Sequence, residues 1–408
     1  MPDNRPPEAF PEGPLAGIRV LDIATFVAAP FCGTLLAEFG ADVIKIEQPG
    51  AGDTLRRFGT PVEGADTLVW ASEARNKRSM TLDLRTAEGR DIFLGLVAKS
   101  DVVLENFRPG TLEKWGLGYD VLARVNPRIV MLRVSGYGQT GPMRGKPGFA
   151  RIAHAFGGLA HLAAESGGKP VVPGSTSLAD YMTGLYGAVG VLVALRHAEN
   201  TGEGQEIDIA LYEPVFRVLD EMATVFAHAG FQREPLGADT VNVVPHSHYQ
   251  ARDGAWVAIA CTTDRMWQRL AKAIGIPGLD EDPRYATSKD RERHRDRINA
   301  IVADWTGRHD AADLLDICER FEAPAARLMT IGDIFEDPQY AARGNLLTIT
   351  DPRIGDIVIP APLPRMSRTP PRVTSAGPPL GNATRDVLRD LLGLEDAAIG
   401  DLLRRRIL

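Results

Sequence analysis

The stretch GIRVLDIATFVAAPFCGTLLAEFGADVIKIE (residues 17–47) decides the fold. Its first apolar run, Ile18–Asp22, predicts a short strand. A helical segment over Cys32–Phe39 follows, and Gly40 stands where glycine commonly closes a helix. Asp42–Glu47 (DVIKIE) predicts a second strand. A strand, a helix and a strand at this spacing predict a βαβ unit, and such units build parallel sheets.

The alternation of strand and helix continues downstream. Ser79–Leu84, Val102–Leu104 and Ile129–Val134 predict three further strands, and Ala87–Lys99 predicts a helix between the first two of these. We therefore expect an α/β protein with a doubly wound parallel sheet. Ligands of such sheets bind at the carboxyl ends of the strands.

The middle of the chain has a different pattern. Pro214–Ala229 is helical in its apolar spacing, and alternating apolar residues on either side of Asp253-Gly254 predict a β-hairpin. Helical patterns return at Asp264–Ile274 and Arg291–Thr306. Residues 235–325 are therefore expected to form a smaller α+β domain.

The two ends of the chain carry weaker signals. Residues 1–14 (MPDNRPPEAFPEGP) are polar and rich in proline, so we do not expect a signal peptide there. Proline and glycine gather in residues 360–381, which predicts an extended connector. Residues 382–408 predict two short helices separated by Gly393.

Composition excludes several classes of function. The net charge of −7, with basic residues spread along the chain, does not favour binding to nucleic acid or to an anionic membrane. The sequence contains no run of 18 apolar residues, so we expect no transmembrane helix. The three cysteines, Cys32, Cys261 and Cys318, are far apart and odd in number. We therefore expect no disulfide framework or cysteine-based zinc site, and a reducing cytoplasm as the location.

The segment PGSTSLADYMTGLYGAVG (residues 173–190) sets one carboxylate at the start of a helix of small residues. Two interpretations of Asp180 remain open. In the first, Ser177 and Asp180 form a capping box, which is a structural role. In the second, Asp180 is a carboxylate nucleophile that the positive end of the helix dipole keeps ionised. Gly184, Gly187 and Gly190 follow at three-residue spacing, which indicates either close approach of a backbone or ligand, or core packing.

Basic and amide side chains gather near the predicted strand ends. They are suited to the phosphates and adenine of a nucleotide-like ligand, although each alone is more typical of a solvated surface. No GxGxxG motif follows the first strand and no P-loop motif is present, so neither of these nucleotide-binding motifs supports the prediction. The residues are Asn76, Lys77, Arg78, Arg85, Asn106, Phe107, Arg108, Lys114 and Lys146.

The histidines indicate little by themselves. His246 and His248 form an H-x-H pair without a downstream cluster at ligand spacing, so we expect no metal site. His154 lies in a helical pattern and is expected to be either packed or a substrate contact. No GxSxG motif supports a serine hydrolase.

An ordered series of short motifs runs along nearly the whole chain. It comprises PLAGIRVLD (14–22), GADVIKIEQPGAGD (40–53), NKRSMTLDLRTAEG (76–89), ENFRPGTLEKWGLGYD (105–120), NPRIVMLRVSGYGQTGP (126–142), SLADYMTGLYG (177–187), TGEGQEIDIALYE (201–213), EDPQYAARG (336–344) and PPLGNAT (378–384). Through this series the chain resembles the class III CoA-transferases, the formyl-CoA transferase and carnitine CoA-transferase family also called CaiB/BaiF.

The resemblance implies a role for Asp180 as the nucleophile that forms an aspartyl-CoA thioester. A CoA thioester is then the substrate, and no permanently bound cofactor or metal is implied. The resemblance also implies a set of CoA contacts. These are Val27, Ala28, Gln48, Leu82, Asp83, Leu84, Arg85, Asn106, Phe107, Arg108, Lys114, Lys146, Phe149 and Ala150.

The chain departs from the family pattern at three of these contacts, Gln48, Phe149 and Ala150. Gln48 stands where the family often has arginine, and Gly148-Phe149-Ala150 replaces a Gly-(Tyr/His)-(Asp/Glu) triplet. Racemases of 2-methylacyl-CoA share the fold and use histidine at the place of Phe149 to move a proton. Phenylalanine cannot carry a proton, so transfer is favoured over racemisation, with an intramolecular CoA transferase as a further alternative.

The acid that receives CoA is expected to be a dicarboxylate. The glycine-rich loop of formyl-CoA transferase has no clear counterpart, because the corresponding residues 236–249 read LGADTVNVVPHSHY. Arg151 is suited to pair with a distal carboxylate, and His154, His246 and His248 are further candidates. We expect succinyl-CoA as donor and a malate-, citramalate- or glutarate-like acid as acceptor.

The resemblance finally implies an interlocked homodimer. Each chain then contains a Rossmann-like large domain built from both termini, residues 1–220 together with 335–408. The small α+β domain, 235–325, is joined to it by linkers at 221–234 and 326–334. The Pro-rich connector is compatible with this arrangement.

Overall fold

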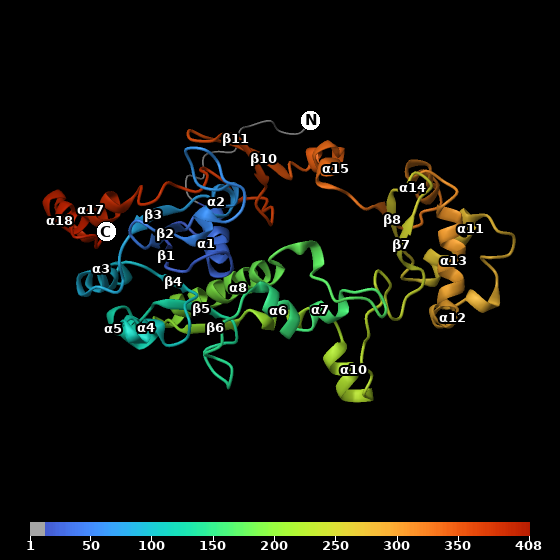
Figure 1. The fold of residues 1–408 in the computed structure, drawn as a ribbon, viewed down its shortest axis with the longest axis horizontal. Coiled ribbons are helices and arrows are strands. Elements are labelled where there is room, and N and C mark those ends of the chain that lie inside the picture. The colour runs from blue at the N-terminus through green and yellow to red at the C-terminus, as the bar shows by residue number, and fades with distance from the viewer. Residues whose placement is uncertain (1–12) are drawn as a thin grey trace. The chain divides into compact units, whose positions relative to one another are not determined.

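The computed structural model describes residues 13–408. The segment for which the sequence predicted no signal peptide therefore lies almost entirely outside the described residues. The chain forms two compact units (Figure 1). The first contains the residues up to Leu159, Val172–Asp220 and Gly344–Leu408, and the second contains Ala160–Val171 and Glu221–Arg343. Residues 160–171 and 335–343, which the predicted scheme included in the large domain, thus belong to the second unit.

A six-stranded parallel sheet forms the centre of the first unit. Its strand order, β3-β2-β1-β4-β5-β6, is that of a doubly wound Rossmann-like sheet, so the predicted α/β class is confirmed. The strand predicted over Ser79–Leu84 ends earlier than expected. The strands are β1 (Arg19–Asp22), β2 (Asp42–Glu47), β3 (Arg78–Thr81), β4 (Val102–Glu105), β5 (Val130–Ser135) and β6 (Glu206–Ala210).

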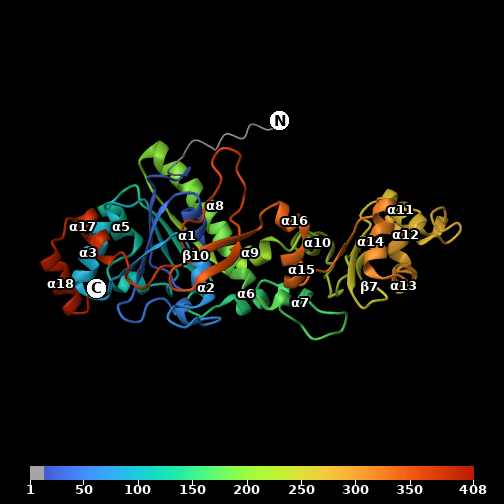
Figure 2. The same cartoon turned by 90° about the horizontal axis from the view of Figure 1, so that it is seen from above.

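Successive residues of the inner strands enter two different cores. Val20 and Val43 belong to one core and their neighbours Leu21 and Ile44 to the other, because side chains alternate across a strand. Both faces must therefore be covered. Helices α1 (Ala28–Glu38) and α8 (Leu178–Thr201) cover the first face; the second is covered by α3 (Ala87–Val97), α5 (Tyr119–Val125), α17 (Thr384–Leu392) and α18 (Asp396–Arg404) (Figures 1 and 2).

Helix α8 packs closely because of its glycines. A Cβ atom on Gly184 would lie 2.7 Å from the Ala28 carbonyl oxygen, and one on Gly187 would lie 2.7 Å from the Leu132 side chain. The glycine spacing thus serves core packing against α1 and β5. Within residues 13–408, α8 alone is long and apolar enough to span a membrane by length and composition, and its glycine face is packed within the unit.

Shorter elements complete the first unit. The connector after residue 360 runs without helix or strand as far as residue 383, and the two predicted C-terminal helices, α17 and α18, are present. The hairpin β10–β11 was not predicted. The remaining elements are η1 (Thr54–Arg57), α2 (Leu68–Glu73), α4 (Thr111–Lys114), α6 (Ala150–Phe156), α7 (Leu159–Leu162, at the unit boundary), η2 (Pro173–Ser175), α9 (Tyr212–Arg217), β10 (Leu346–Asp351) and β11 (Gly355–Pro360).

The second unit has an antiparallel sheet of order β7-β8-β9 and a separate core. The predicted hairpin at Asp253-Gly254 is confirmed, with Gly254 at φ 86°. The helices expected over 214–229 and 291–306 are each divided in two. The elements are α10 (Met222–Ala229), β7 (His246–Gln250), β8 (Trp256–Ala260), α11 (Asp264–Ile274), η3 (Pro283–Tyr285), α12 (Ser288–Arg293), α13 (Arg295–Thr306), α14 (Ala311–Arg320), β9 (Ala325–Arg327), α15 (Ile331–Glu336) and α16 (Pro338–Ala342).

Candidate active site

The carboxyl ends of the parallel strands open into two adjoining pockets of the first unit. The larger, which we call the Asp180 pocket, has a volume of about 610 Å³. Besides Asp180 it is lined by residues that follow four different strands: Val27 after β1, Phe107 after β4, Gly136 after β5 and Leu211 after β6. The pocket therefore lies where doubly wound sheets bind their ligands.

The smaller pocket, which we call the Gln48 pocket, has a volume of about 200 Å³. It is lined by residues that follow β2 and β3, including Gln48 and Arg85. Thr25, Thr54 and Phe107 line both pockets. The two pockets therefore lie side by side along the edge of the sheet and share a wall.

The structure brings most of the predicted site residues to these pockets. Lys114 lies in α4 and lines neither of them, and His246 and His248 lie on strand β7 of the second unit. The Gln48 pocket contains Gln48, Leu82, Asp83, Leu84 and Arg85. The Asp180 pocket contains Val27, Ala28, Asn106, Phe107, Arg108, Lys146, Phe149, Ala150, Arg151, His154 and Asp180.

The predicted capping box at the start of α8 is wrong. Ser177 is the N-cap residue, but its hydroxyl accepts no capping hydrogen bond. Its ψ of 47° lies outside the extended conformation of a typical N-cap, so the hydroxyl is not directed at the first amides of the helix. Within the described chain, the Asp180 carboxylate has no hydrogen bond or ion pair, which leaves it available to a ligand.

The first turn of α8 is capped by His154 instead. The backbone N–H of Ala179 donates to Nε2 of His154 at 3.0 Å, and the imidazole is fully buried. A nitrogen that accepts a hydrogen bond carries no proton, which assigns the proton to Nδ1. Burial, aided by the charge of Arg151, lowers the pKa of His154 and favours this neutral form. His154 therefore holds the amide next to Asp180.

Burial raises the pKa of Asp180 to about 7. The sequence predicted that the helix N-terminus would keep this carboxylate ionised, whereas removal of water acts in the opposite direction. Near neutral pH the group is present in both protonation states. Its ionised form is poorly solvated and unpaired, as an activated carboxylate nucleophile requires.

Several polar groups predicted to bind ligand are already engaged by the protein. Lys77 is buried and its ammonium lies 2.9 Å from the Asp22 carboxylate, so its prediction as a phosphate ligand is wrong. Arg85 pairs with Asp83 at 2.7 Å but remains half exposed. The amide of Asn106 binds both polar backbone groups of one loop residue. Arg108, Lys146 and Arg151 are exposed where they line the Asp180 pocket.

The sequence profile of CoA-transferase family III matches residues 15–384, which include both pockets. The chain belongs to CoA-transferase family III. This confirms the resemblance inferred from the motifs and the prediction of a CoA-transferase.

Relatives of this family III chain agree with the assignment. It is 54% identical to a succinyl-CoA–L-malate CoA-transferase beta subunit of Chloroflexus aurantiacus, over 97% of this chain and 98% of the relative. It is 41% identical to a succinyl-CoA–D-citramalate CoA-transferase of the same organism, over the full length of both. The crystal structure of a CAIB/BAIF family protein from Brucella suis superposes with a TM-score of 0.82 at 33% identity and covers 93% of this chain and 100% of that chain.

Sequence reasoning missed a group of buried charges at the Gln48 pocket of this CoA-transferase, two of which, Lys45 and Glu47, line it. Asp22, Lys45 and Glu47 lie inside strands or at their ends, and each is at most 4% exposed. One signal in the sequence could have revealed them. Charged residues within apolar strands that are covered on both faces are buried, and buried charges must be paired. Among the described residues, no group of three or more His, Cys, Asp or Glu side chains is arranged to hold a metal ion.

Proposed function

We propose that the chain transfers CoA from succinyl-CoA, or a similar dicarboxylyl-CoA, to a second dicarboxylic acid through an intermediate on Asp180. The observation that carries the proposal is the unpaired Asp180 carboxylate, which lines a pocket adjoining a second pocket at the carboxyl edge of the sheet. The names of the relatives, with succinyl-CoA, L-malate and D-citramalate, support the substrate class.

The nucleotide end of CoA occupies the Gln48 pocket in this proposal. The shared wall then guides the pantetheine arm to the Asp180 pocket. Arg108 and Lys146 are exposed cations at the Asp180 pocket and Arg85 is half exposed in the Gln48 pocket, so charge-assisted hydrogen bonds to phosphate are available along this path.

The reaction proceeds by exchange of activated acyl bonds. The Asp180 carboxylate attacks the thioester carbonyl of the donor, which forms a mixed anhydride and releases CoA thiolate. The thiolate then attacks the Asp180 carbonyl, which leaves an aspartyl-CoA thioester and the free donor acid. The acceptor carboxylate repeats these steps in reverse, so that Asp180 is regenerated. No bond is hydrolysed, and covalent catalysis divides the exchange into easier steps.

Trapping of the intermediate tests the proposal. Hydroxylamine added with succinyl-CoA should convert Asp180 to a hydroxamate, detected by mass spectrometry of the peptide that contains it. Asp180→Ala should abolish both labelling and transfer. Absence of label on Asp180 with every acyl-CoA offered would refute the covalent mechanism.

The acceptor is proposed to be a malate-, citramalate- or glutarate-like dicarboxylate. Arg151 lines the Asp180 pocket and is exposed, so its guanidinium is available to a distal carboxylate. A panel of acids tested with succinyl-CoA should show transfer to dicarboxylates, and Arg151→Gln should reduce that selectivity. Transfer confined to monocarboxylic acids would contradict the proposal.

The alternative of a racemase has less support. Phe149 is 67% exposed at the Asp180 pocket, at the position where the resemblance places a proton-carrying histidine in racemases. The phenylalanine side chain can neither donate nor accept a proton, so proton exchange at the α-carbon of the substrate lacks a second acid or base. Incubation of an acyl-CoA in D₂O should therefore introduce no deuterium at this carbon.

We further propose that the domains combine in an interlocked homodimer. One side of α8 exposes the apolar side chains of Leu185, Tyr186, Val189, Leu192 and Val193. A contiguous apolar patch is typical of a surface that is covered in an assembly. Light scattering of the purified chain should give the mass of a dimer. A stable monomer would refute the dimer, and a requirement for a second kind of chain would favour a heteromer instead.

A further inference from the structure

The loop between β1 and α1, residues 23–27, forms the wall that the two pockets share. Ile23 and Ala24 line the Gln48 pocket, Phe26 and Val27 line the Asp180 pocket, and Thr25 lines both. The position of this loop therefore sets the width of both pockets at once. The contacts that hold this loop therefore affect where a ligand lies in the two pockets.

Side chains from other segments bind the backbone of this loop. The Asp22 carboxylate accepts the N–H of Ala24 at 3.2 Å, and the buried ammonium of Lys45 donates to the Ala24 carbonyl. Asn106 accepts the N–H of Thr25 at 2.8 Å and donates to its carbonyl at 2.7 Å. Ile23 still donates its N–H to the Leu104 carbonyl of β4 at 3.0 Å, and beyond it the loop is held by polar side chains.

Asp53, which also lines the Gln48 pocket, holds the most constrained residue of the loop. Its Oδ1 accepts the backbone N–H groups of Phe26 at 3.0 Å and of Leu55 at 2.9 Å, while Oδ2 lies 3.0 Å from the Lys45 ammonium. Phe26 has φ 63°, the left-handed region that bulky residues avoid. Such a conformation persists only where the surroundings impose it. Asp53 supplies the hydrogen bond that imposes it here.

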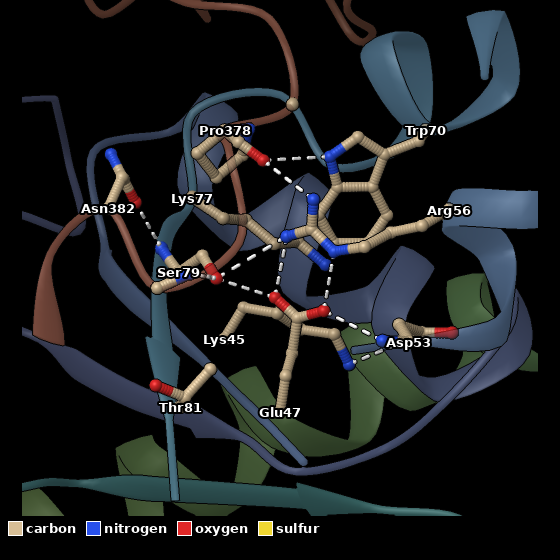
Figure 3. Close-up of polar contacts among 12 residues, drawn as sticks. Lys45, Glu47, Asp53, Arg56, Trp70, Lys77, Ser79, Thr81, Pro378 and Asn382 are labelled. Carbon is tan, nitrogen blue, oxygen red and sulfur yellow. Dashed lines mark hydrogen bonds and ion pairs between the residues drawn. The ribbon is translucent and has the colours of Figure 1, made fainter. Parts of the chain in front are cut away.

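Asp53 is itself fixed by a buried cluster that reaches the C-terminal part of the chain (Figure 3). Its backbone N–H donates to Glu47 at 2.8 Å, and Arg56 binds both oxygens of Glu47 at 2.7 Å. The Arg56 guanidinium lies 3.8 Å from the ring centre of Trp70, and both side chains donate to the Pro378 carbonyl at 3.0 Å. The cluster therefore links the loop to strand β2, helix α2 and the segment that contains Pro378.

We propose that Asp53 is a positioning residue for CoA transfer. By holding Phe26 in its left-handed conformation, Asp53 fixes the shared wall and with it the placement of the thioester relative to Asp180. This inference rests on the proposed transfer function. Misplacement of a reacting group by about 1 Å can lower a rate by about 100-fold, so a small shift of the wall is enough to be measured.

Single-turnover labelling of Asp180 in the full chain, with succinyl-CoA and hydroxylamine, tests the proposal. Asp53→Ala should slow labelling by about 10- to 100-fold at saturating succinyl-CoA. Asp53→Asn keeps an oxygen for the Phe26 and Leu55 amides but loses the charge opposite Lys45. It should therefore slow labelling less than Asp53→Ala does. Asp66→Asn is the matched control, because Asp66 pairs with Arg56 at the outer side of the cluster and should leave the rate near that of the unmodified chain.

A double-mutant cycle with Phe26→Gly separates positioning from general stability. Glycine adopts φ near 63° without help, so Asp53→Ala should slow labelling less in the Phe26→Gly background. Equal effects in both backgrounds, or an unchanged rate in folded Asp53→Ala, would overturn the proposal. If Asp53→Ala does not fold, Asp53→Ser takes its place, because its side chain is one atom too short to reach the Phe26 N–H; a labelling rate equal to that of Asp66→Asn would then overturn the proposal. Failure of the unmodified chain to label would instead refute the proposed function on which the inference depends.

Discussion

Replacement of Asp180 by asparagine should stabilise the protein above neutral pH while it abolishes transfer. In the folded chain burial raises the pKa of this carboxyl from 3.8 to about 7, and within the described residues it has no charged partner to offset that burial. Asparagine has nearly the same shape but no charge. The variant therefore removes a cost that the unmodified chain bears only when Asp180 is ionised.

The sign and the size of this effect follow from proton linkage. Because the folded pKa is raised, the contribution of Asp180 to stability is greatest below pH 3.8 and is lost as the pH rises to about 7. At about 1.4 kcal/mol per pKa unit, the full loss has an upper bound of roughly 4 kcal/mol. The side chain is only partly buried, so solvent reduces the expected gain of the asparagine variant to about 1–3 kcal/mol.

Thermal unfolding at two pH values measures the effect. The gain in free energy of unfolding for Asp180→Asn should be about twice as large at pH 8.5 as at pH 5.5. Asp91→Asn, at an exposed position of α3, is the control and should show no such trend. In the unmodified chain, kcat/KM should rise with pH up to about 7, as Asp180 ionises. A variant that is less stable at both pH values would refute this reasoning.

Three further substitutions test the surroundings of the site. His154→Leu removes the acceptor of the Ala179 N–H and should slow labelling of Asp180, whereas His154→Gln should retain most of the rate; equal rates would exclude a capping role. Gly184→Ala puts a methyl group 2.7 Å from a backbone oxygen of α1 and should lower the free energy of unfolding in urea by about 1–3 kcal/mol. Gly190→Ala, whose methyl group would meet only a side chain at 3.3 Å, is its control and should be nearly neutral. Lys45→Met leaves a buried carboxylate without its cation and should cost about 3–5 kcal/mol, and an unchanged urea midpoint would show that the pair is not needed.

The secondary structure of the central sheet was largely predictable, because its signals are local. The apolar run Asp42–Glu47 and the glycine at Gly40 mark a strand and a helix end at the positions where the structure has them. The hairpin β10–β11 and the division of the segment 291–306 into two helices were missed. The hairpin has a local signal that was overlooked, Asp351-Pro352 and Gly355 between two runs of alternating apolar residues. Residues 291–306 contain no glycine or proline, so packing decided where that segment divides.

The sequence predicted which residues form the candidate site better than it predicted the contacts of those residues. Asp180 and most of the predicted CoA contacts line the two pockets, because motifs at the ends of parallel strands meet at one edge of the sheet. Lys77 was misjudged, because its neighbours in sequence do not reveal that Asp22 is its partner across the fold. Pairing at this range depends on strand order, which no local pattern specifies.

The sequence by itself determined the alternation of strand and helix, the family, and the carboxylate that begins α8. Each of these depends on residues that are near one another in the chain or that occur in ordered motifs. Only the tertiary structure decided that His154 rather than Ser177 caps α8, and that Asp53 and Lys45 hold the wall between the pockets. Burial sets both outcomes: once water is excluded, most polar groups bind a partner in space, whatever its distance along the chain.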